Sequence, residues 1–209
     1  MTEQLREIIS ADLFEGKDFG MFQLFKLRLE NSSADAIWLL RSYLFWTAEH
    51  SHPITRRRNR ILLERRYGIF CGKDVKIGMG LKLPHPQGII IGKGCTIGRN
   101  CVIYQQVTIG GHGGNTSFSN YPSLGNGIVL YAGAKIIGDI SIGDDSIIGA
   151  NSVVNKSITD RGGGYMWGHL LERSKKYRNR YQREENRQRR RMHANQNKKY
   201  FKKSSIWLY

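Results

Sequence analysis

The sequence has few of the residues that mark secreted or metal-stapled domains. It contains three cysteines among 209 residues, Cys71, Cys95 and Cys101, and no Cys-x-x-Cys pair. An odd number of cysteines without such a pair argues against a disulfide framework and against a zinc site. Only four prolines accompany 24 glycines, which argues against a proline-rich disordered chain and indicates many tight backbone turns.

Long apolar stretches are also missing. The longest apolar run, residues 37–46, is interrupted by Arg41 and is too short to cross a bilayer. The N-terminal segment, MTEQLREIIS, lacks the basic and apolar regions of a signal peptide. We therefore expect a cytoplasmic protein.

Acidic residues are scarce, and the excess of positive charge is concentrated near the C-terminal end. The formal net charge is +16, and residues 172–209 contribute 14 Lys and Arg against three acids. A basic tail interleaved with tyrosines can bind an acidic polysaccharide, anionic lipid head groups or RNA. The alternative is a solvated extension that binds nothing.

The N-terminal part of the chain, residues 1–68, shows helical periodicity. Apolar residues recur at three- and four-residue spacing in LREIISADLF, FQLFKLRL and ADAIWLLRSYLFW, and Ser33 is a suitable N-cap for the third segment. A fourth, basic segment, TRRRNRILLERRYG, ends at Gly68. No catalytic motif occurs here, so residues 1–68 are predicted to be a helical cap that serves packing and oligomerisation.

From residue 71 onward the hydrophobic period changes to six. The aliphatic residues that recur at this spacing, in two runs, are Ile91, Ile97, Ile103 and Ile109, then Leu124, Leu130, Ile136, Ile142, Ile148 and Val154. A period of six fits neither an α-helix nor an alternating strand, but it is typical of a parallel β-helix in which three hexapeptides, one per face, make one coil. Residues 69–160 are therefore predicted to form an all-β parallel β-helix, with residues 1–68 and 161–209 covering its ends.

Two irregularities interrupt this period. Ile91 follows Leu83 by eight positions instead of six, and a longer excursion, loop 111–123, separates Ile109 from Leu124. Insertions in repeat proteins map to loops that often form the binding face. A binding or catalytic site is therefore expected at these two segments.

His85 lies in the first irregularity, between Pro84 and Pro86. The prolines stiffen the backbone and so can aim the imidazole. A histidine side chain is suited to take a proton from a hydroxyl group at neutral pH. His85 is thus a candidate general base, the alternative being a loop histidine without a role.

The segment LPHPQGIIIGKGCTIGRNCVIYQQVTIGG resembles the serine acetyltransferase branch of the hexapeptide acyltransferases. Within that branch it is most similar to the capsular and exopolysaccharide O-acetyltransferases, and the resemblance covers about residues 55–160. It implies a left-handed parallel β-helix, assembly as a homotrimer, and acetyl-CoA bound between neighbouring subunits without a metal. The catalytic histidine of the family falls on His85.

Three positions depart from serine acetyltransferase. Pro84 replaces the Asp that directly precedes the family's catalytic histidine, Phe70 replaces its orienting Asp, and Tyr121 replaces the histidine of a His-Pro pair in its long loop. The groups that would hold the carboxylate and ammonium of serine are therefore missing. The resemblance then favours a sugar hydroxyl as acceptor, with serine or a small sugar as the alternative.

The resemblance also implies a track for acetyl-CoA. The family's pantetheine arm lies along small corner residues, which correspond to Ala132 and, one full coil later, to Ala150. Asn155 and Lys156 match the family's pair at the nucleotide end, where a lysine suits a phosphate. Ordinary coil corners and a solvated surface charge are the alternatives.

Two later residues complete this implied track. Arg173 stands at a suitable distance along the chain to reach the 3′-phosphate, and Trp167 is placed either to stack on adenine or to plug the end of the coil. The family's Gly-x-Pro-Ala signature is absent from this region, which reads YMWGHLL at residues 165–171.

Further candidates for contacting the acceptor or the oxyanion are Gln105, Gly110, Gly111, His112 and Tyr121. The backbone N–H groups of the glycine pair are suited to hold a developing oxyanion. His112 lies where another branch of the superfamily places its base. For each of these residues, the alternative is a purely structural role.

Three classes of function remain open. The first is an O-acetyltransferase acting on a capsular or other surface polysaccharide, with the tail holding an acidic glycan or the inner face of the membrane; nucleic acid is not expected as a partner. The second is acetylation of serine or a small sugar. The third is a non-enzymatic β-helix scaffold with a polyanion-binding tail. A γ-class carbonic anhydrase would need three zinc histidines, whereas the coil region holds only His85 and His112.

Overall fold

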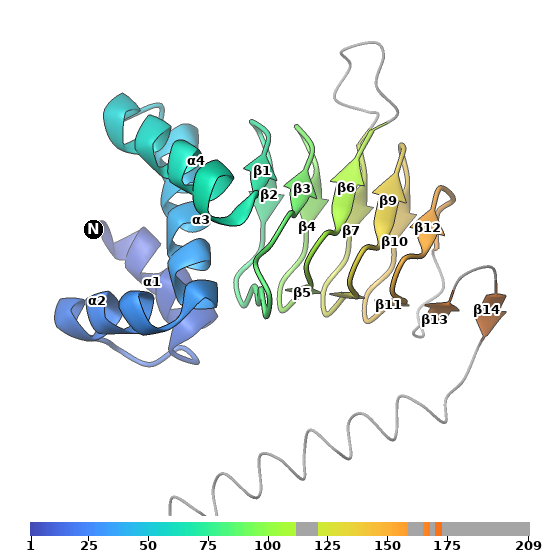
Figure 1. Cartoon of the computed structure of the whole chain (residues 1–209), viewed down its shortest axis with the longest axis horizontal. Helices are drawn as coiled ribbons and strands as arrows, with labels where there is room; N and C mark the ends of the chain where they lie inside the picture. The colour runs from blue at the N-terminus through green and yellow to red at the C-terminus, as the bar shows by residue number, and fades with distance from the viewer. Residues whose placement is uncertain (112–120, 159–164, 168–169, 173–209) are drawn as a thin grey trace, which may run out of the picture. The chain divides into compact units, whose positions relative to one another are not determined.

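The structure is a computed structural model that describes residues 1–111, 121–158, 165–167 and 170–172. The chain begins with four α-helices: α1 (Glu3–Leu13), α2 (Met21–Glu30), α3 (Ser32–Ala48) and α4 (Pro53–Tyr67). A stack of short strands follows them (Figure 1). Among the described residues no helix is both long and apolar enough to cross a membrane.

The strands form three parallel sheets, here called A, B and C. Sheet A consists of β1 (Phe70–Cys71), β3 (Ile90–Ile91), β6 (Thr108–Gly110), β9 (Lys135–Ile137) and β12 (Val153–Val154). Sheet B consists of β2 (Lys76–Ile77), β4 (Thr96–Ile97), β7 (Ser123–Leu124) and β10 (Ser141–Ile142). Sheet C consists of β5 (Val102–Ile103), β8 (Val129–Leu130), β11 (Ile147–Ile148), β13 (Tyr165–Trp167) and β14 (Leu170–Glu172), the last pairing antiparallel with β13.

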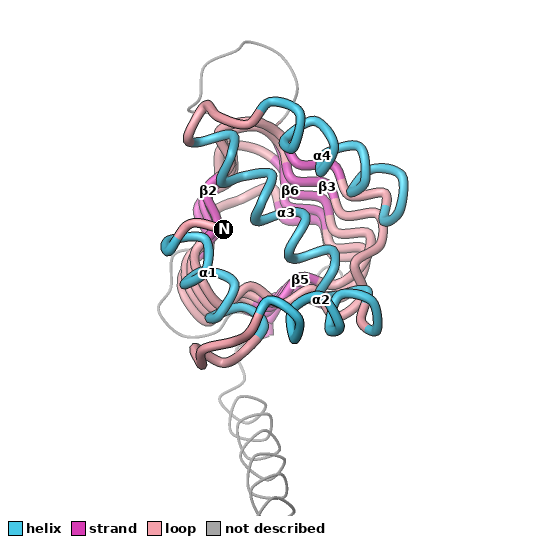
Figure 2. The backbone as a smooth tube through the Cα atoms, turned by 90° about the vertical axis from the view of Figure 1, so that its left-hand side faces the viewer, coloured by secondary structure: helices cyan, strands magenta, loops and turns pink. Residues whose placement is uncertain are grey.

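The chain passes from sheet A to sheet B to sheet C and returns to sheet A one coil further on. Figure 2 shows the successive coils behind one another, with the helices in front of the first coil. Register partners lie three hexapeptides apart, as in the pairing of Ile91 with Ile109 and of Leu124 with Ile142. All ten aliphatic residues of the six-residue period are buried, none more than 4% exposed. The predicted parallel β-helix is confirmed.

Both irregularities leave this buried column unbroken. Cys71 pairs with Ile91, whereas an uninterrupted coil would pair it with Ile89, so the segment around His85 lengthens its coil by two positions. Ile97 pairs with Leu124, whereas an uninterrupted coil would reach only position 115, so the excursion is the longer insertion. Each extra segment emerges at a corner between two sheets, and the inward side chains continue in register on either side of it.

The first coil has no earlier coil to bond to, and a buried ion pair takes that place. Arg41 of α3 contacts Asp12 (2.6 Å) and donates to the carbonyls of Ile77 (2.7 Å) and Gly78 (2.6 Å). Asp12 accepts from the backbone N–H groups of Gly80 (2.7 Å) and Leu81 (3.0 Å). The helical cap therefore satisfies backbone groups at the edge of the β-helix that would otherwise be buried without partners.

The helices differ from expectation in one detail, the N-cap of α3. Asn31, not Ser33, is the N-cap of α3, because the Asn31 side chain accepts from the Ala34 N–H (3.1 Å). The predicted helix over FQLFKLRL is confirmed as α2, in which Leu24 is the one buried residue. The predicted end of the fourth helix is confirmed, with Gly68 as a C-cap in the left-handed region.

Candidate active site

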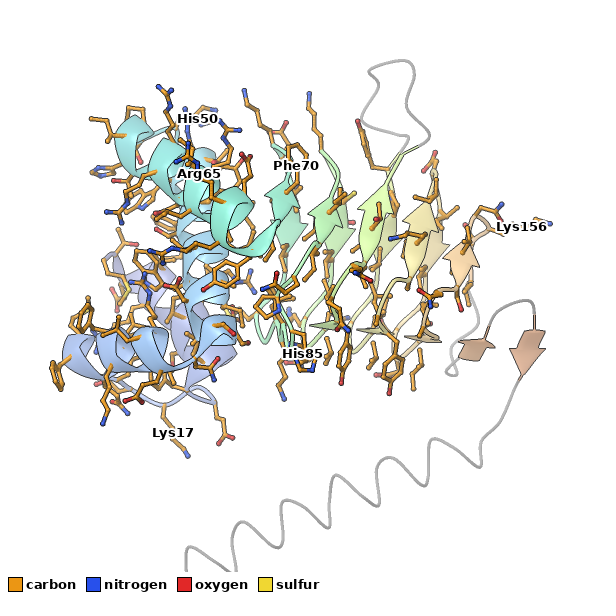
Figure 3. All side chains as sticks on the ribbon, viewed as in Figure 1. Lys17, His50, Arg65, Phe70, His85 and Lys156 are labelled. Carbon is orange, nitrogen blue, oxygen red and sulfur yellow. The ribbon has the colours of Figure 1, made fainter. Side chains whose placement is uncertain are left out.

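His85 lies where the chain turns from sheet C back to sheet A, on a corner of the first coil (Figure 3). Pro86 is buried, whereas Pro84 and His85 are exposed. The Gln87 N–H donates to the His85 carbonyl (2.8 Å), which closes a tight turn. The buried proline anchors this turn and leaves the imidazole directed away from the core.

The same corner recurs in every later coil and aligns four of the candidate residues. Backbone hydrogen bonds run up this corner from Gln106 to the Gln87 carbonyl (2.8 Å), from Gly133 to the Gln105 carbonyl (2.9 Å) and from Asn151 to the Ala132 carbonyl (2.9 Å). His85, Gln105, Ala132 and Ala150 therefore follow one another along a single edge, here called the C–A corner.

The C–A corner depends on left-handed backbone. The residues in this conformation are Gly88, Gln106, Gly133 and Asn151, with φ between 56° and 72°. A Cβ on Gly133 would meet the side-chain oxygen of Asn151, and its φ of 72° also favours glycine. The small residues Ala132 and Ala150 lie beside this column and leave the edge of the coils open.

Two tyrosines, which the sequence analysis missed, extend the corner on the sheet C side. The ring centroid of Tyr104 lies 6.1 Å from that of His85, and the ring of Tyr131 stacks on Tyr104 at 5.2 Å and 22°. Each tyrosine directly follows an inward aliphatic residue of sheet C, and this register is the sequence signal that could have revealed them. The candidate base is therefore the first ring of an aromatic row.

On the sheet A side of this corner lie Lys135, which was not predicted from the sequence, and Gln105, which was. Lys135 of β9 donates to the Gln106 carbonyl (2.6 Å) and to the Thr108 hydroxyl (3.2 Å), which holds a half-buried positive charge near the corner. The side-chain oxygen of Gln105 is buried and has no hydrogen-bond partner among the described residues. A buried acceptor without a hydrogen-bond partner is rare in folded proteins, so Gln105 stays a candidate site residue.

Other candidate residues lie on a different edge, the A–B corner, where sheet A meets sheet B. Gly110 and Gly111 are partly exposed there, and a Cβ on Gly110 would meet nothing within 4 Å. Tyr121 packs against the core at this corner. One chain therefore does not bring these residues and His85 together, since sheet A separates them.

Asn155 and Lys156 are exposed and directly follow β12, so they lie on the A–B corner of the last coil. Figure 3 shows Lys156 at the end of the coil stack remote from His85. His112 and Arg173 lie outside the described residues. Trp167 belongs to β13, of which only the backbone is described.

The described residues include no group of three His, Cys, Asp or Glu side chains that could hold a metal ion. All three cysteines are free and buried inside the coils. Burial raises the pKa of Cys71 to about 12 and that of Cys95 to about 11. These thiols are therefore packing groups, not nucleophiles.

The outward sides of the three sheets differ in chemistry. Sheet A exposes Phe70, Ile90 and Val153, each at least 42% exposed. Sheet B instead presents hydroxyl groups, and Thr96 donates to Ser123 (2.9 Å). Thr108 and Lys135 lie in register between Ile90 and Val153, so the outward row of sheet A is apolar only at its two ends. The C–A corner near His85 borders the end formed by Phe70 and Ile90.

The six-residue period has a direct counterpart among known families. Residues 121–156 match the family model described as bacterial transferase hexapeptide (six repeats). These residues carry the hexapeptide repeat. The match begins after the excursion and covers the late coils, where Ala132, Ala150 and Lys156 lie.

Sequence comparison finds relatives beyond the matched repeat. The chain is 44% identical over 91 residues to a serine acetyltransferase of Staphylococcus aureus and 35% identical over 113 residues to one of Synechococcus elongatus. These alignments cover 44% and 54% of this chain but only 42% and 46% of the relatives. The chain thus spans less than half the length of these curated relatives.

A solved structure extends the similarity to the helical region. A serine acetyltransferase of Neisseria gonorrhoeae superposes with a TM-score of 0.67 at 25% identity, covering 82% of this chain and 66% of that one. This similarity supports the left-handed winding expected for the β-helix. The narrower resemblance to capsular and exopolysaccharide O-acetyltransferases gains no support, because the relatives are named serine acetyltransferases.

Proposed function

We propose that this chain is an acetyl-CoA-dependent O-acetyltransferase in which His85 is the general base. The observation that carries the proposal is the C–A corner, which aligns His85 with the small residues Ala132 and Ala150. Three coils separate the corner positions of His85 and Ala150, a distance of roughly 14 Å at ordinary strand spacing. An extended thioester arm can follow this edge and end at the imidazole.

The relatives favour the same chemistry. Over aligned segments of 91 and 113 residues, serine acetyltransferases from two bacteria are 44% and 35% identical to this chain. A serine acetyltransferase structure in complex with CoA superposes on 66% of the chain with a TM-score of 0.57. Acetyl-CoA is therefore the proposed co-substrate, and the proposed reaction routes no step through a metal ion.

In the proposed reaction, His85 accepts the proton of the acceptor hydroxyl while that oxygen attacks the thioester carbonyl. A backbone N–H group stabilises the oxyanion that develops, and Gly110 and Gly111 remain the proposed donors. The imidazolium of His85 then gives its proton to the departing CoA thiolate. His85 thus carries out both proton transfers, and no covalent acetyl-enzyme is formed.

This scheme needs more than one chain, because His85 and the glycine pair lie on opposite edges of sheet A. We infer a homotrimer in which the C–A corner of one subunit meets the A–B corner of the next. The apolar outward side chains of sheet A support this assembly, since Phe70, Ile90 and Val153 would be covered by the neighbour. Asn155 and Lys156 would then line the same groove.

Serine or another small hydroxyl compound is the first candidate acceptor, because the relatives act on serine by name. A sugar hydroxyl is the second candidate. The resemblance favours it: exposed Pro84 and Phe70 stand where the resemblance to serine acetyltransferases implies two aspartates, so the groups expected to hold the charges of serine are absent there. The predicted contact of the basic tail with a membrane or an acidic glycan stays a prediction, because residues 173–209 lie outside the described residues.

The decisive experiment measures release of the CoA thiol from acetyl-CoA with serine, simple sugars and polysaccharides offered as acceptors. His85→Ala is expected to lower kcat/KM by at least about a hundredfold, which is the contribution of a general base. His50→Ala, which removes an exposed histidine of the helical cap, should leave turnover unchanged.

Two results would contradict the proposal. One is a folded His85→Ala protein with turnover close to that of the unchanged chain. The other is the absence of acceptor-dependent thiol release with every acceptor class, which would favour the scaffold alternative. A preference for serine over sugars would decide between the two candidate acceptors.

A further inference from the structure

The imidazole of His85 is not held by a polar partner. The turn fixes the backbone of this residue, because Pro86 is buried and the Gln87 N–H donates to the His85 carbonyl (2.8 Å). A fixed backbone still leaves the side chain a choice of rotamers. No hydrogen bond or ion pair of the imidazole is found among the described residues. A general base acts efficiently only when its ring is held in one orientation, so this role falls to a contact of another kind.

Tyr104 lies against His85 in the next coil of the C–A corner. The ring centroids are 6.1 Å apart and the rings are inclined at 49°, within the range of roughly 4.5–7 Å over which aromatic rings attract each other. The Ile103 N–H, next to Tyr104, donates to the Lys82 carbonyl (2.9 Å) at the start of the turn. The register of the coils therefore keeps Tyr104 beside the imidazole.

Tyr131 supports Tyr104 on the side away from His85. Its ring stacks on that of Tyr104, with the centroids 5.2 Å apart and an inclination of 22°. The Tyr104 N–H donates to the Leu130 carbonyl (2.9 Å), which fixes the two tyrosines in adjacent coils. Both tyrosines are half-buried. Because Tyr131 occupies the space on its far side, the ring of Tyr104 has little freedom to turn away from His85.

We propose that Tyr104, supported by Tyr131, is a positioning residue that holds the imidazole of His85 in the orientation needed for proton transfer. The inference rests on the proposed function, because Tyr104 acts through the general base of that reaction. Its ring restricts the rotamers of an otherwise exposed side chain. It also places an electron-rich π-system beside the imidazolium that forms once His85 has taken the acceptor proton. The same contact stabilises this charge until His85 gives the proton to the CoA thiolate.

Tyr104→Leu tests this role in the full chain, because it removes the ring and keeps an apolar side chain. We expect kcat to fall roughly tenfold through lost alignment and lost stabilisation of the imidazolium. The KM values for acetyl-CoA and for the acceptor should stay within about twofold, since Tyr104 acts through His85. Tyr104→Phe keeps the ring and should keep kcat within about twofold. Val102→Ala trims a half-buried outward residue of the same coil and should leave turnover unchanged.

A second measurement follows the imidazole directly and needs no turnover. Selective ¹³C labelling of histidine gives a ring signal for each of the six histidines, and His85→Gln identifies the signal of residue 85. Relaxation of this signal should report a rigid imidazole in the unchanged chain and in Tyr104→Phe, and a mobile one in Tyr104→Leu. Circular dichroism shows whether each variant is folded.

Either of two results would overturn the assignment. One is a folded Tyr104→Leu protein whose kcat and imidazole relaxation match those of the unchanged chain. The other is a raised KM for the acceptor with an unchanged kcat, which would make Tyr104 a contact of the acceptor instead. If the unchanged chain released no thiol with any acceptor, the proposed function would fail, while the relaxation measurement would still decide whether Tyr104 holds the ring.

Discussion

At the scale of single residues, burial determines the reactivity of the three thiols. Cys71, Cys95 and Cys101 point into the coils, and burial raises the pKa of each thiol above its ordinary value. A thiolate is the reactive form of cysteine, so these side chains are inert at neutral pH. The thiol-release assay for acetyl transfer is therefore free of background from the folded protein.

The same shift makes stability depend on alkaline pH. The pKa of Cys71 rises from 9.0 to about 12 on folding, so the folded state keeps a proton that the unfolded state loses between these values. Titration of Cys71 therefore leaves the free energy of unfolding unchanged below about pH 9 and lowers it as the pH rises toward 12. Urea denaturation at neutral pH and at about pH 10 measures this loss.

Cys71→Ala is the control for this effect. It removes the titrating group, so its stability should fall less steeply over the same alkaline range, although its stability at neutral pH will be lower because of the lost packing. An identical slope for the variant and the unchanged chain would show that Cys71 does not contribute.

At the scale of elements, the contact between the helices and the first coil is the critical junction. The Asp12 side chain is fully buried and that of Arg41 is 4% exposed. Together they hydrogen-bond backbone groups of residues 77–81. Within the described part of the β-helix, a strand inside the stack is covered by the strands of the neighbouring coils, whereas this end relies on side chains of the helices.

Arg41→Met should therefore be strongly destabilising. It leaves Asp12 buried without its charged partner and removes the donors to the Ile77 and Gly78 carbonyls, a loss of about 3–5 kcal/mol. Urea denaturation followed by circular dichroism measures the change. Lys17→Met, which removes an exposed ion pair with Glu15, should change stability by less than about 1 kcal/mol. Equal effects of the two substitutions would contradict the role of the buried pair.

The sequence predicts some of these elements well and others poorly, for physical reasons. A six-residue period reports directly which side chains point inward, so the coils and the common corner of Ala132 and Ala150 follow from counting. The Asp12–Arg41 pair does not, because its members are far apart in the sequence and meet only when α1 and α3 dock. The apolar spacing of α2 correctly predicts a helix, but periodicity does not tell whether the same chain buries the apolar side, and here only Leu24 is buried.

At the scale of the whole molecule, the candidate residues fall on two edges that one chain keeps apart. His85 lies on the C–A corner, while Lys156 lies on the A–B corner of the last coil. A site formed between subunits would draw one edge from each of two neighbours. Two variants that are inactive for different reasons should then restore each other's activity.

Mixed assemblies of His85→Ala and Lys156→Glu test this arrangement. In an equal mixture, about a quarter of the interfaces of a trimer pair an intact His85 with an intact Lys156, and activity should recover to about that fraction. Mixing His85→Ala with His85→Gln should restore nothing. If the first mixture stayed as inactive as its components, the site would lie within one chain or Lys156 would have no part in it.

The excursion between Ile109 and Leu124 is the part of the β-helix that can change most freely in length and sequence. The buried column continues across it without a gap, and the entropy of closing a surface loop rises only slowly with its length. This segment can therefore lengthen, shorten or change composition over evolutionary time while the coils remain intact. In the proposed acetyltransferase, preference for one acceptor over another can diverge here without a matching loss of thermodynamic stability.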